Sequence, residues 1–206
     1  LAPAPVALVG GVAFDGVNSY NSIFHAAAGE LSEVYRKRAL VPVNERHYTA
    51  GRSLPPVGIG GMAVGMGVCL DSVFGALARE SVRAGAQALV YVTEDSFAGR
   101  TVTPELHQRV TAFRAVETGR IVVFANQSGP SGVFDNRGRI ASRIAHGEVA
   151  GVVTSVPAFA GVTPFVRLGD SVGTLATLAA LAGLVAALTH RGRAPAEAQA
   201  MLSRSR

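Results

Sequence analysis

Cys69 is the residue whose type and position most directly suggest chemistry. It is the only cysteine among 206 residues. It follows an apolar run, residues 63–68, that predicts a buried strand, and it precedes a predicted helix over residues 72–84 that Gly85 ends. Side chains at the carboxyl end of a strand, where the chain turns into a helix, are well placed for catalysis in α/β folds. We therefore predict that Cys69 is a nucleophile, against the alternative of a buried apolar thiol.

A cysteine that transfers an acyl group needs two kinds of helper. A carboxylate can take up the thiol proton, and an ammonium can neutralise the tetrahedral oxyanion. Lys37 is the only lysine among 19 basic residues, and its compact, titratable ammonium differs in chemistry from a guanidinium. The candidate partners at predicted loop or strand-end positions are Lys37, Glu45, Asp71, Glu94 and Asp95.

Composition excludes several classes of protein. Hydrophobic residues make up 49% of the chain and charged residues 16%, which is typical of a folded protein and not of a disordered one. One cysteine excludes an internal disulfide framework, and the five histidines do not fall at zinc-ligand spacings, so we predict no metal and no cofactor. The net charge of +5 is spread along the chain without a nucleic-acid-binding motif, and no nucleic-acid partner is expected.

The order of the predicted elements indicates an α/β layered sandwich. A three-stranded meander is followed by a Gly- and Pro-rich segment, predicted to be a mobile loop. Two strand–helix units, a further strand and a hairpin complete the pattern. The predicted strands cover residues 5–13, 20–26, 31–35, 63–68, 88–93 and 121–125, the loop residues 49–62, the second helix residues 104–118, and the hairpin residues 132–144.

The C-terminal part differs in kind. Residues 172–188 contain no charge, and with their neighbours they approach the ~20 residues needed to cross a bilayer. Four arginines follow, which predicts a cytoplasmic C-terminal end. The sequence thus predicts an extracytoplasmic domain at residues 1–170, a transmembrane helix at 171–190 and a basic cytoplasmic tail at 191–206. An Ala-rich core helix is the alternative for the apolar segment.

Four motifs, in order along the chain, resemble the carbon–nitrogen hydrolase (nitrilase) superfamily, and within it most closely the apolipoprotein N-acyltransferase family. The resemblance covers about residues 5–170 and implies a nitrilase-like αββα sandwich. The motifs are Tyr20-Asn-Ser22, Tyr35-Arg-Lys-Arg-Ala-Leu-Val-Pro-Val-Asn-Glu45, Val68-Cys-Leu-Asp71 and Arg114-Ala-Val-Glu-Thr-Gly-Arg120.

The resemblance implies roles for individual residues. Cys69 corresponds to the nucleophile that carries the acyl thioester, and Lys37 to the lysine that stabilises the oxyanion. Glu45 corresponds to the acidic residue that supports the site. Asp71 stands where the acyltransferases have a glutamate, although it could equally cap the following helix. His107, on the second predicted helix, is expected to be structural.

The resemblance also implies what this sequence does not contain. The general-base glutamate of the family lies in a Pro-Glu segment upstream of Leu1, so we expect the chain to be an N-terminally truncated fragment. Glu30 and Glu33 lie in a turn and a strand of the meander and are not expected to replace it. Arg114 and Glu117, spaced i, i+3, predict a structural ion pair.

The function implied is transfer of an acyl chain from a phospholipid donor to the N-terminal amine of a lipoprotein acceptor, at the bacterial inner membrane with the catalytic domain on the periplasmic side. Two alternatives stay open. One is an amidase-type hydrolase of the same superfamily, to which Phe97 (in place of the acyltransferase tryptophan) and a short 45–69 segment point. The other is an inactive fragment without the glutamate.

Overall fold

The computed structural model describes residues 6–52, 55–155, 157 and 159–191. Two units make up the chain, Leu1–Arg167 and Leu168–Arg206. The first unit contains all of the described strands, and the second contains one long helix. Each unit is described separately below.

Three strands form a small antiparallel sheet in the order β1-β2-β3. They are β1 (Val6–Phe14), β2 (Ser19–Ala27) and β3 (Glu30–Arg36). The first turn is built by Asp15, whose carboxylate accepts hydrogen bonds from the N–H groups of Val17 and Asn18. The predicted meander is confirmed.

Six strands form a second, mixed sheet in the order β4-β5-β6-β7-β8-β9. The central strands β5, β6 and β7 are parallel, and the remaining pairs are antiparallel. The strands are β4 (Val57–Ile59), β5 (Met62–Val68), β6 (Ala88–Thr93), β7 (Ile121–Asn126), β8 (Ser131–Phe134) and β9 (Ile140–Ile144).

Helices α1 (Gly75–Arg83) and α2 (Thr103–Thr118) connect the parallel strands. Pro104 lies in the first turn of α2, where a missing N–H costs nothing. Gly119 ends α2 with φ 66°, the left-handed conformation that favours glycine at a helix C-terminus. A short helix, α3 (Pro164–Leu168), follows later in the chain.

The helix predicted over residues 72–84 is partly wrong. Cys69–Val73 forms a separate 3₁₀ turn, and Phe74 after it is extended, with φ −92° and ψ 103°. The α-helix begins only at Gly75. The reason is local: the Asp71 side chain accepts the Val68 N–H and the Asp71 carbonyl accepts the Phe74 N–H, which closes the 3₁₀ turn on itself.

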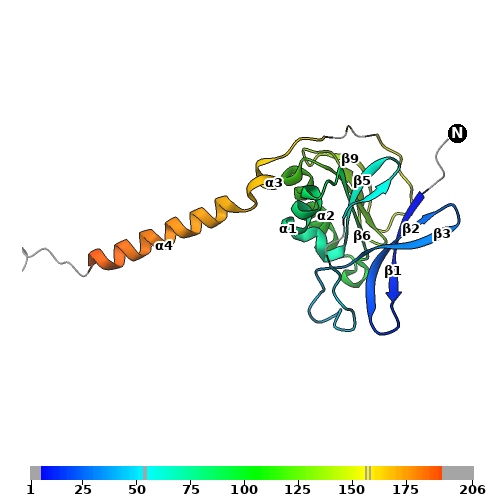
Figure 1. Ribbon diagram of the computed structural model, residues 1–206, viewed down its shortest axis with the longest axis horizontal. Coiled ribbons are helices and arrows are strands. Elements are labelled where there is room, and N and C mark those ends of the chain that lie inside the picture. Colours follow the sequence, from blue (N-terminus) through cyan, green and yellow to red (C-terminus); the bar gives the residue numbers. More distant parts are fainter. Residues whose placement is uncertain (1–5, 53–54, 156, 158, 192–206) are drawn as a thin grey trace, which may run out of the picture. The chain divides into compact units, whose positions relative to one another are not determined.

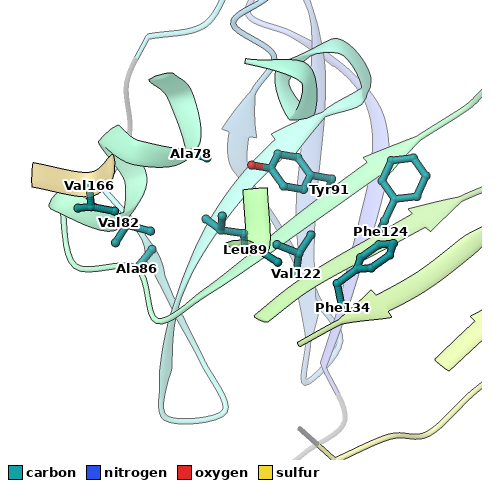
Figure 2. Packing of buried hydrophobic residues seen from close by; sticks show 10 residues of the cluster. Ala78, Val82, Ala86, Leu89, Tyr91, Val122, Phe124, Phe134 and Val166 are labelled. Atoms are coloured by element: carbon teal, nitrogen blue, oxygen red, sulfur yellow. The ribbon is translucent and has the colours of Figure 1, made fainter. Parts of the chain in front are cut away.

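Three layers result, with α1 and α2 on one face of the six-stranded sheet and the small sheet on the other (Figure 1). On the helix side, Leu89 and Val122 of the sheet pack against Ala78 and Val82 of α1 (Figure 2). On the other side, Ile23 and other residues of the small sheet pack against β5. The predicted α/β sandwich is confirmed, and the described elements provide three of the four layers of an αββα arrangement.

The segment predicted as a mobile loop, residues 49–62, contains a strand. β4 pairs with β5 through a tight turn at Gly60 and Gly61, which have φ values of 57° and 82°. A loop prediction was natural for a run so rich in glycine and proline, but glycines at positive φ also build hairpins. Residues 53–54 of this segment lie outside the described residues.

The second unit contains α4 (Ser171–Arg191). Within Ser171–His190, an 18-residue stretch has a mean hydropathy of 2.0, and the helix is long and apolar enough to cross a membrane. The predicted basic tail, residues 191–206, lies outside the described residues apart from Arg191.

Candidate active site

Cys69 lies directly after β5, where the chain turns sharply into the 3₁₀ segment. Its φ is 47°, a left-handed value that a residue with a side chain rarely adopts. The residue is partly buried and lines a cavity. The predicted strand-end position of Cys69 is confirmed, and the strained backbone resembles the elbow on which other folds present nucleophiles.

The cavity has a volume of about 870 Å³ and is lined by both sheets. Cys69, Lys37 and Glu45 all contribute to its wall, so the structure brings the three predicted site residues to one place. Most of the remaining wall is apolar. The apolar lining includes Leu8, Val9, Val41, Val68, Val92, Phe97, Val123, Val133, Ile144 and Val152.

Lys37 and Glu45 form a buried ion pair. Nζ of Lys37 lies 2.7 Å from Oε2 of Glu45, and the lysine side chain is only 1% exposed. Lys37 follows β3, and its backbone is held on both sides: its N–H donates to the Asn21 carbonyl, and its carbonyl accepts the Gly51 N–H. An ammonium buried and paired in this way has a fixed position at the cavity wall.

Glu45 is held by three donors. Besides Lys37, the Asn21 side-chain amide donates to Oε1 at 2.9 Å and the Val41 N–H donates to Oε2 at 2.7 Å. Burial raises the pKa of this carboxyl, but the Lys37 ammonium and the two N–H donors outweigh burial and hold the pKa below its usual value. Glu45 is therefore a carboxylate whose two oxygens accept hydrogen bonds from Lys37, Asn21 and Val41.

Asp71 faces the backbone. Its carboxylate accepts hydrogen bonds from the Val68 N–H at 2.9 Å, the Ala39 N–H at 2.7 Å and the Tyr35 hydroxyl at 3.0 Å, with the Arg38 N–H at 3.2 Å. Burial raises its pKa, although these donors oppose the shift. The alternative that Asp71 caps the following helix is wrong, because α1 has Phe74 at its N-cap and no side-chain cap hydrogen bond. Asp71 instead joins the backbone at Arg38 and Ala39 to the Cys69 turn.

The thiol of Cys69 is not activated by its surroundings alone. Burial raises its pKa, and the nearby Lys37 ammonium offsets this only in part. Reaction as a thiolate therefore requires a base that removes the proton.

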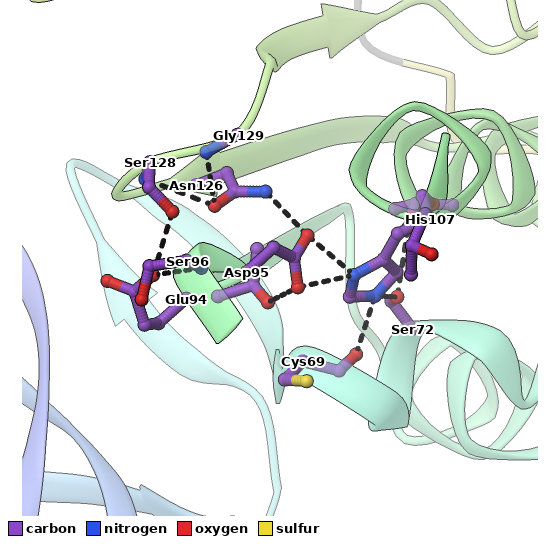
Figure 3. Close-up of polar contacts among 12 residues, drawn as sticks. Cys69, Ser72, Glu94, Asp95, Ser96, His107, Asn126, Ser128 and Gly129 are labelled. Atoms are coloured by element: carbon purple, nitrogen blue, oxygen red, sulfur yellow. Dashed lines mark hydrogen bonds and ion pairs between the residues drawn. The ribbon is translucent and has the colours of Figure 1, made fainter. Parts of the chain in front are cut away.

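A second polar network adjoins Cys69 (Figure 3). Nδ1 of His107 is 3.0 Å from the Asp95 carboxylate, and Nε2 is 3.2 Å from the carbonyl oxygen of Cys69 and 2.9 Å from Oγ of Ser72. Asp95 was among the candidate carboxylates, but the position of His107 on α2 gave no signal of this contact. His107 lies 12 positions from Asp95 and 38 from Cys69, and no local pattern reports such contacts.

Among the described residues, Cys69, Asp95 and His107 form a group that could hold a metal ion. One donor atom from each of Cys69, Asp95 and His107 lies within 4.8 Å of the others. The Asp95 and His107 atoms, however, already bond to each other, to Asn126 and to Ser72. A metal ion would have to break these hydrogen bonds in order to bind.

Arg114 ties α2 to the Cys69 turn. Its guanidinium donates to the carbonyl oxygens of Ser72 and Val73, and it pairs with Glu117 at 2.6 Å. The predicted i, i+3 ion pair is confirmed. Helix α2 thus contacts the turn through His107, through Arg114 and through Thr111, whose hydroxyl donates to Ser72 Oγ at 2.8 Å.

Known proteins share both this sequence and this fold. Proteins named apolipoprotein N-acyltransferase from Nitrosomonas europaea and Gloeobacter violaceus are 35% and 36% identical over 144 and 159 residues, which are 68% and 76% of this chain. The matches cover 28% and 30% of those relatives, so the chain spans less than half of their length.

Solved structures agree on the fold. An amidase from Nesterenkonia sp. gives a TM-score of 0.59 at 22% identity, with 69% of this chain and 58% of that chain covered. Nit3 of Saccharomyces cerevisiae, a member of branch 10 of the nitrilase superfamily, gives 0.57 at 25% identity, with 69% and 55% covered. Both share the nitrilase-type sandwich.

The carbon-nitrogen hydrolase family matches residues 4–156, which include every candidate site residue and more than half of the chain. The resemblance inferred from the four motifs is therefore confirmed: this chain belongs to the carbon-nitrogen hydrolase family.

Proposed function

We propose that this chain is the thiol-bearing part of an apolipoprotein N-acyltransferase, with Cys69 as nucleophile, Lys37 as oxyanion stabiliser and Glu45 as the residue that fixes Lys37. The observation that carries the proposal is the convergence of these three side chains on one largely apolar cavity. The relatives named above support the same activity.

In the first half-reaction the Cys69 thiolate attacks the ester carbonyl of a phospholipid. The carbonyl oxygen becomes an oxyanion, which the Lys37 ammonium stabilises from its fixed position. The ester C–O bond then breaks, the lysophospholipid hydroxyl leaves with a proton, and the acyl group stays on Sγ as a thioester. The base that takes the thiol proton and returns it is the upstream glutamate that the resemblance implies.

In the second half-reaction the α-amine of a lipoprotein attacks the thioester. The same base accepts the amine proton, an amide bond forms, and the C–S bond breaks to return the thiol. Water in place of the amine would give hydrolysis, so the acceptor decides between a transferase and a hydrolase.

The cavity favours a lipid donor. Its wall beyond Lys37 and Glu45 is mostly apolar and includes Phe97 and Phe124, although polar residues also line it at Thr93, Glu94, Asn126, Gln127 and Ser131. Burying an acyl chain against such a wall stabilises it by about 0.8 kcal/mol for each methylene removed from water. A small polar amide would leave most of this surface without a partner.

The proposed setting is a bacterial inner membrane. We assign α4 as a membrane-spanning helix because of its length and hydropathy. The arginines at positions 191, 193, 204 and 206 favour a cytoplasmic C-terminal end, which leaves residues 1–170 on the periplasmic side. Cysteine accessibility mapping at both ends of α4 in whole cells tests this orientation.

The activity is tested with the full-length protein in phospholipid vesicles that contain a diacylglyceryl-modified peptide with a free N-terminal amine. The proposal predicts an N-acylated peptide, formed by wild type and absent with Cys69→Ala. Release of free fatty acid or of ammonia from small amides, without peptide acylation, would instead establish a hydrolase. Neither product from folded full-length protein would support an inactive chain.

A further inference from the structure

The carbonyl group of Cys69 is held by a side chain from a distant helix. With φ at 47°, the residue is in a conformation that costs about 1–2 kcal/mol for a side chain with a Cβ, so its surroundings must hold it there. Nε2 of His107 lies 3.2 Å from the Cys69 carbonyl oxygen. Fixing that oxygen fixes the peptide plane that follows Cys69, and with it the direction of the thiol.

His107 is itself firmly placed. Its Nδ1 lies 3.0 Å from Oδ2 of Asp95, and its ring packs edge-on against Phe124 with centroids 5.0 Å apart. Asp95 is 2% exposed and also accepts a hydrogen bond from the Asn126 side-chain amide at 2.7 Å (Figure 3). A buried carboxylate with several donors positions the ring as a rigid unit.

The two ring nitrogens of His107 face different partners. Nδ1 faces the Asp95 carboxylate at 3.0 Å, so it donates a hydrogen bond to it. Nε2 faces two oxygen atoms of the Cys69 turn, Ser72 Oγ at 2.9 Å and the Cys69 carbonyl oxygen at 3.2 Å. With one nitrogen bonded to Asp95, the ring is held so that the other contacts the turn.

We propose that His107, oriented by Asp95, is a positioning residue that holds the strained Cys69 turn through the contacts of Nε2 with the Cys69 carbonyl oxygen and Ser72 Oγ. It does not act as the base, because Nε2 is engaged by the Cys69 carbonyl and Ser72 Oγ. The inference rests on the proposed role of Cys69 as a nucleophile but not on the identity of the acyl donor or acceptor.

Alkylation of Cys69 by iodoacetamide tests the inference without any lipid. Full-length protein is labelled at fixed pH, and the peptide that contains Cys69 is quantified by mass spectrometry. His107→Leu removes both hydrogen bonds and lets the turn relax, so the labelling rate is expected to fall about tenfold. His107→Gln keeps a neutral donor near Nε2 and is expected to restore the rate to within about threefold of wild type.

Asp95 supplies the decisive comparison, since its effect should pass through His107. Asp95→Asn is expected to slow labelling about tenfold in the wild-type chain but less than about twofold in the His107→Gln chain, where no imidazole ring needs to be oriented. Glu105→Gln, on the same helix but paired with Arg143, serves as the control and should stay close to wild type.

The outcomes separate the possibilities. Equal labelling rates in wild type and folded His107→Leu would overturn the inference. So would a His107→Gln variant as slow as His107→Leu, or an Asp95→Asn effect that is the same in both backgrounds. If His107→Leu does not fold, the Asp95→Asn cycle in the Gln background decides alone. If the labelling rates are as predicted but no acyl transfer is detected, this inference stands and the acyltransferase proposal is refuted.

In the acyl-transfer assay, the same variants should lower kcat while leaving KM for the phospholipid near its wild-type value. His107 lies behind Cys69, outside the cavity lining, so its loss should disturb the reacting atom and not the binding of the acyl chain. A rise in KM with kcat unchanged would contradict a positioning role.

Discussion

Glu45 and Asp71 are two acidic residues near the candidate nucleophile, and the structure gives them opposite environments. Glu45 pairs with an ammonium at the cavity wall, and its pKa is held below the usual value. Asp71 is surrounded by backbone N–H groups and a tyrosine hydroxyl, and burial raises its pKa. Charge type and burial alone therefore do not identify a functional carboxylate.

The difference lies in what each carboxylate fixes. Glu45 binds two side chains, the Lys37 ammonium at the cavity wall and the Asn21 amide, and also accepts the Val41 N–H. Asp71 joins two backbone segments, the loop at Arg38 and Ala39 and the turn after Val68. We expect a change at Glu45 to alter chemistry more than stability, and a change at Asp71 to do the reverse.

Lys37→Met gives the largest expected effect. The substitution removes the proposed oxyanion stabiliser but keeps an apolar side chain of similar length in the buried position. Loss of one preorganised donor should lower the acyl-transfer rate by about 10²–10³-fold, which is ~2.7–4 kcal/mol. Initial rates of peptide acylation measure it. Activity within tenfold of wild type would show that Lys37 is not the oxyanion partner.

Asp71→Asn should mainly destabilise the fold. The Val68 and Ala39 N–H groups donate to different oxygens of Asp71, and the amide NH₂ group of asparagine can accept neither bond, so at least one of these donors is left unpaired. We expect the free energy of unfolding to fall by about 2–4 kcal/mol. Urea unfolding followed by circular dichroism checks the value. A variant that keeps its stability but loses activity would show that Asp71, like Glu45, affects activity more than stability, which would contradict the comparison.

Glu45→Gln should lower acyl transfer by about 10²-fold, because Lys37 loses the charge that orients it. The free energy of unfolding should fall by less than in Asp71→Asn, since the glutamine carbonyl still accepts the Val41 N–H. Parallel activity and unfolding measurements on the two variants test the comparison directly. Equal ratios of activity loss to stability loss in both would contradict it.

The contribution of Glu45 to stability should depend on pH in a defined direction. A carboxyl whose pKa is lowered on folding stabilises the fold above its ordinary pKa of 4.5, and the stabilisation is lost as the pH falls through the folded-state value. Wild type should therefore exceed Glu45→Gln in unfolding free energy at pH 7, with the gap narrowing below pH 4.5. A gap that widens in acid would reverse the assigned sign.

Tyr35→Phe is the smallest expected change. It deletes one of the donors to Asp71, at 3.0 Å, and leaves the backbone donors in place. The loss in unfolding free energy should be about 1 kcal/mol, with acyl transfer close to wild type. A large activity loss would indicate that Asp71 acts on the site through Tyr35.

Much of the fold could be predicted from the sequence because the strands are apolar runs separated by turn residues. The strand before Cys69 and the helix ended by Gly119 are both confirmed. The interruption at Phe74 was missed because its cause is a set of hydrogen bonds made by Asp71. The strand β4 was missed because its short sequence is surrounded by glycine and proline.

For the site, the motifs led to Cys69, Lys37 and Glu45, and the structure places all three on one cavity. Their catalytic roles stay predictions. The contact of His107 with Cys69 could not be predicted, since it depends on how α2 crosses the end of β5 and not on any spacing along the chain.

The most direct test of the central claim is mass spectrometry of the full-length protein after incubation with phospholipid vesicles in the absence of an acceptor. The account predicts an acyl group on the peptide that contains Cys69, removed by neutral hydroxylamine as a thioester should be. The adduct should be absent in Cys69→Ala and form much more slowly in Lys37→Met. No acyl adduct on Cys69 in folded, membrane-inserted protein, or an adduct on another residue, would contradict the account.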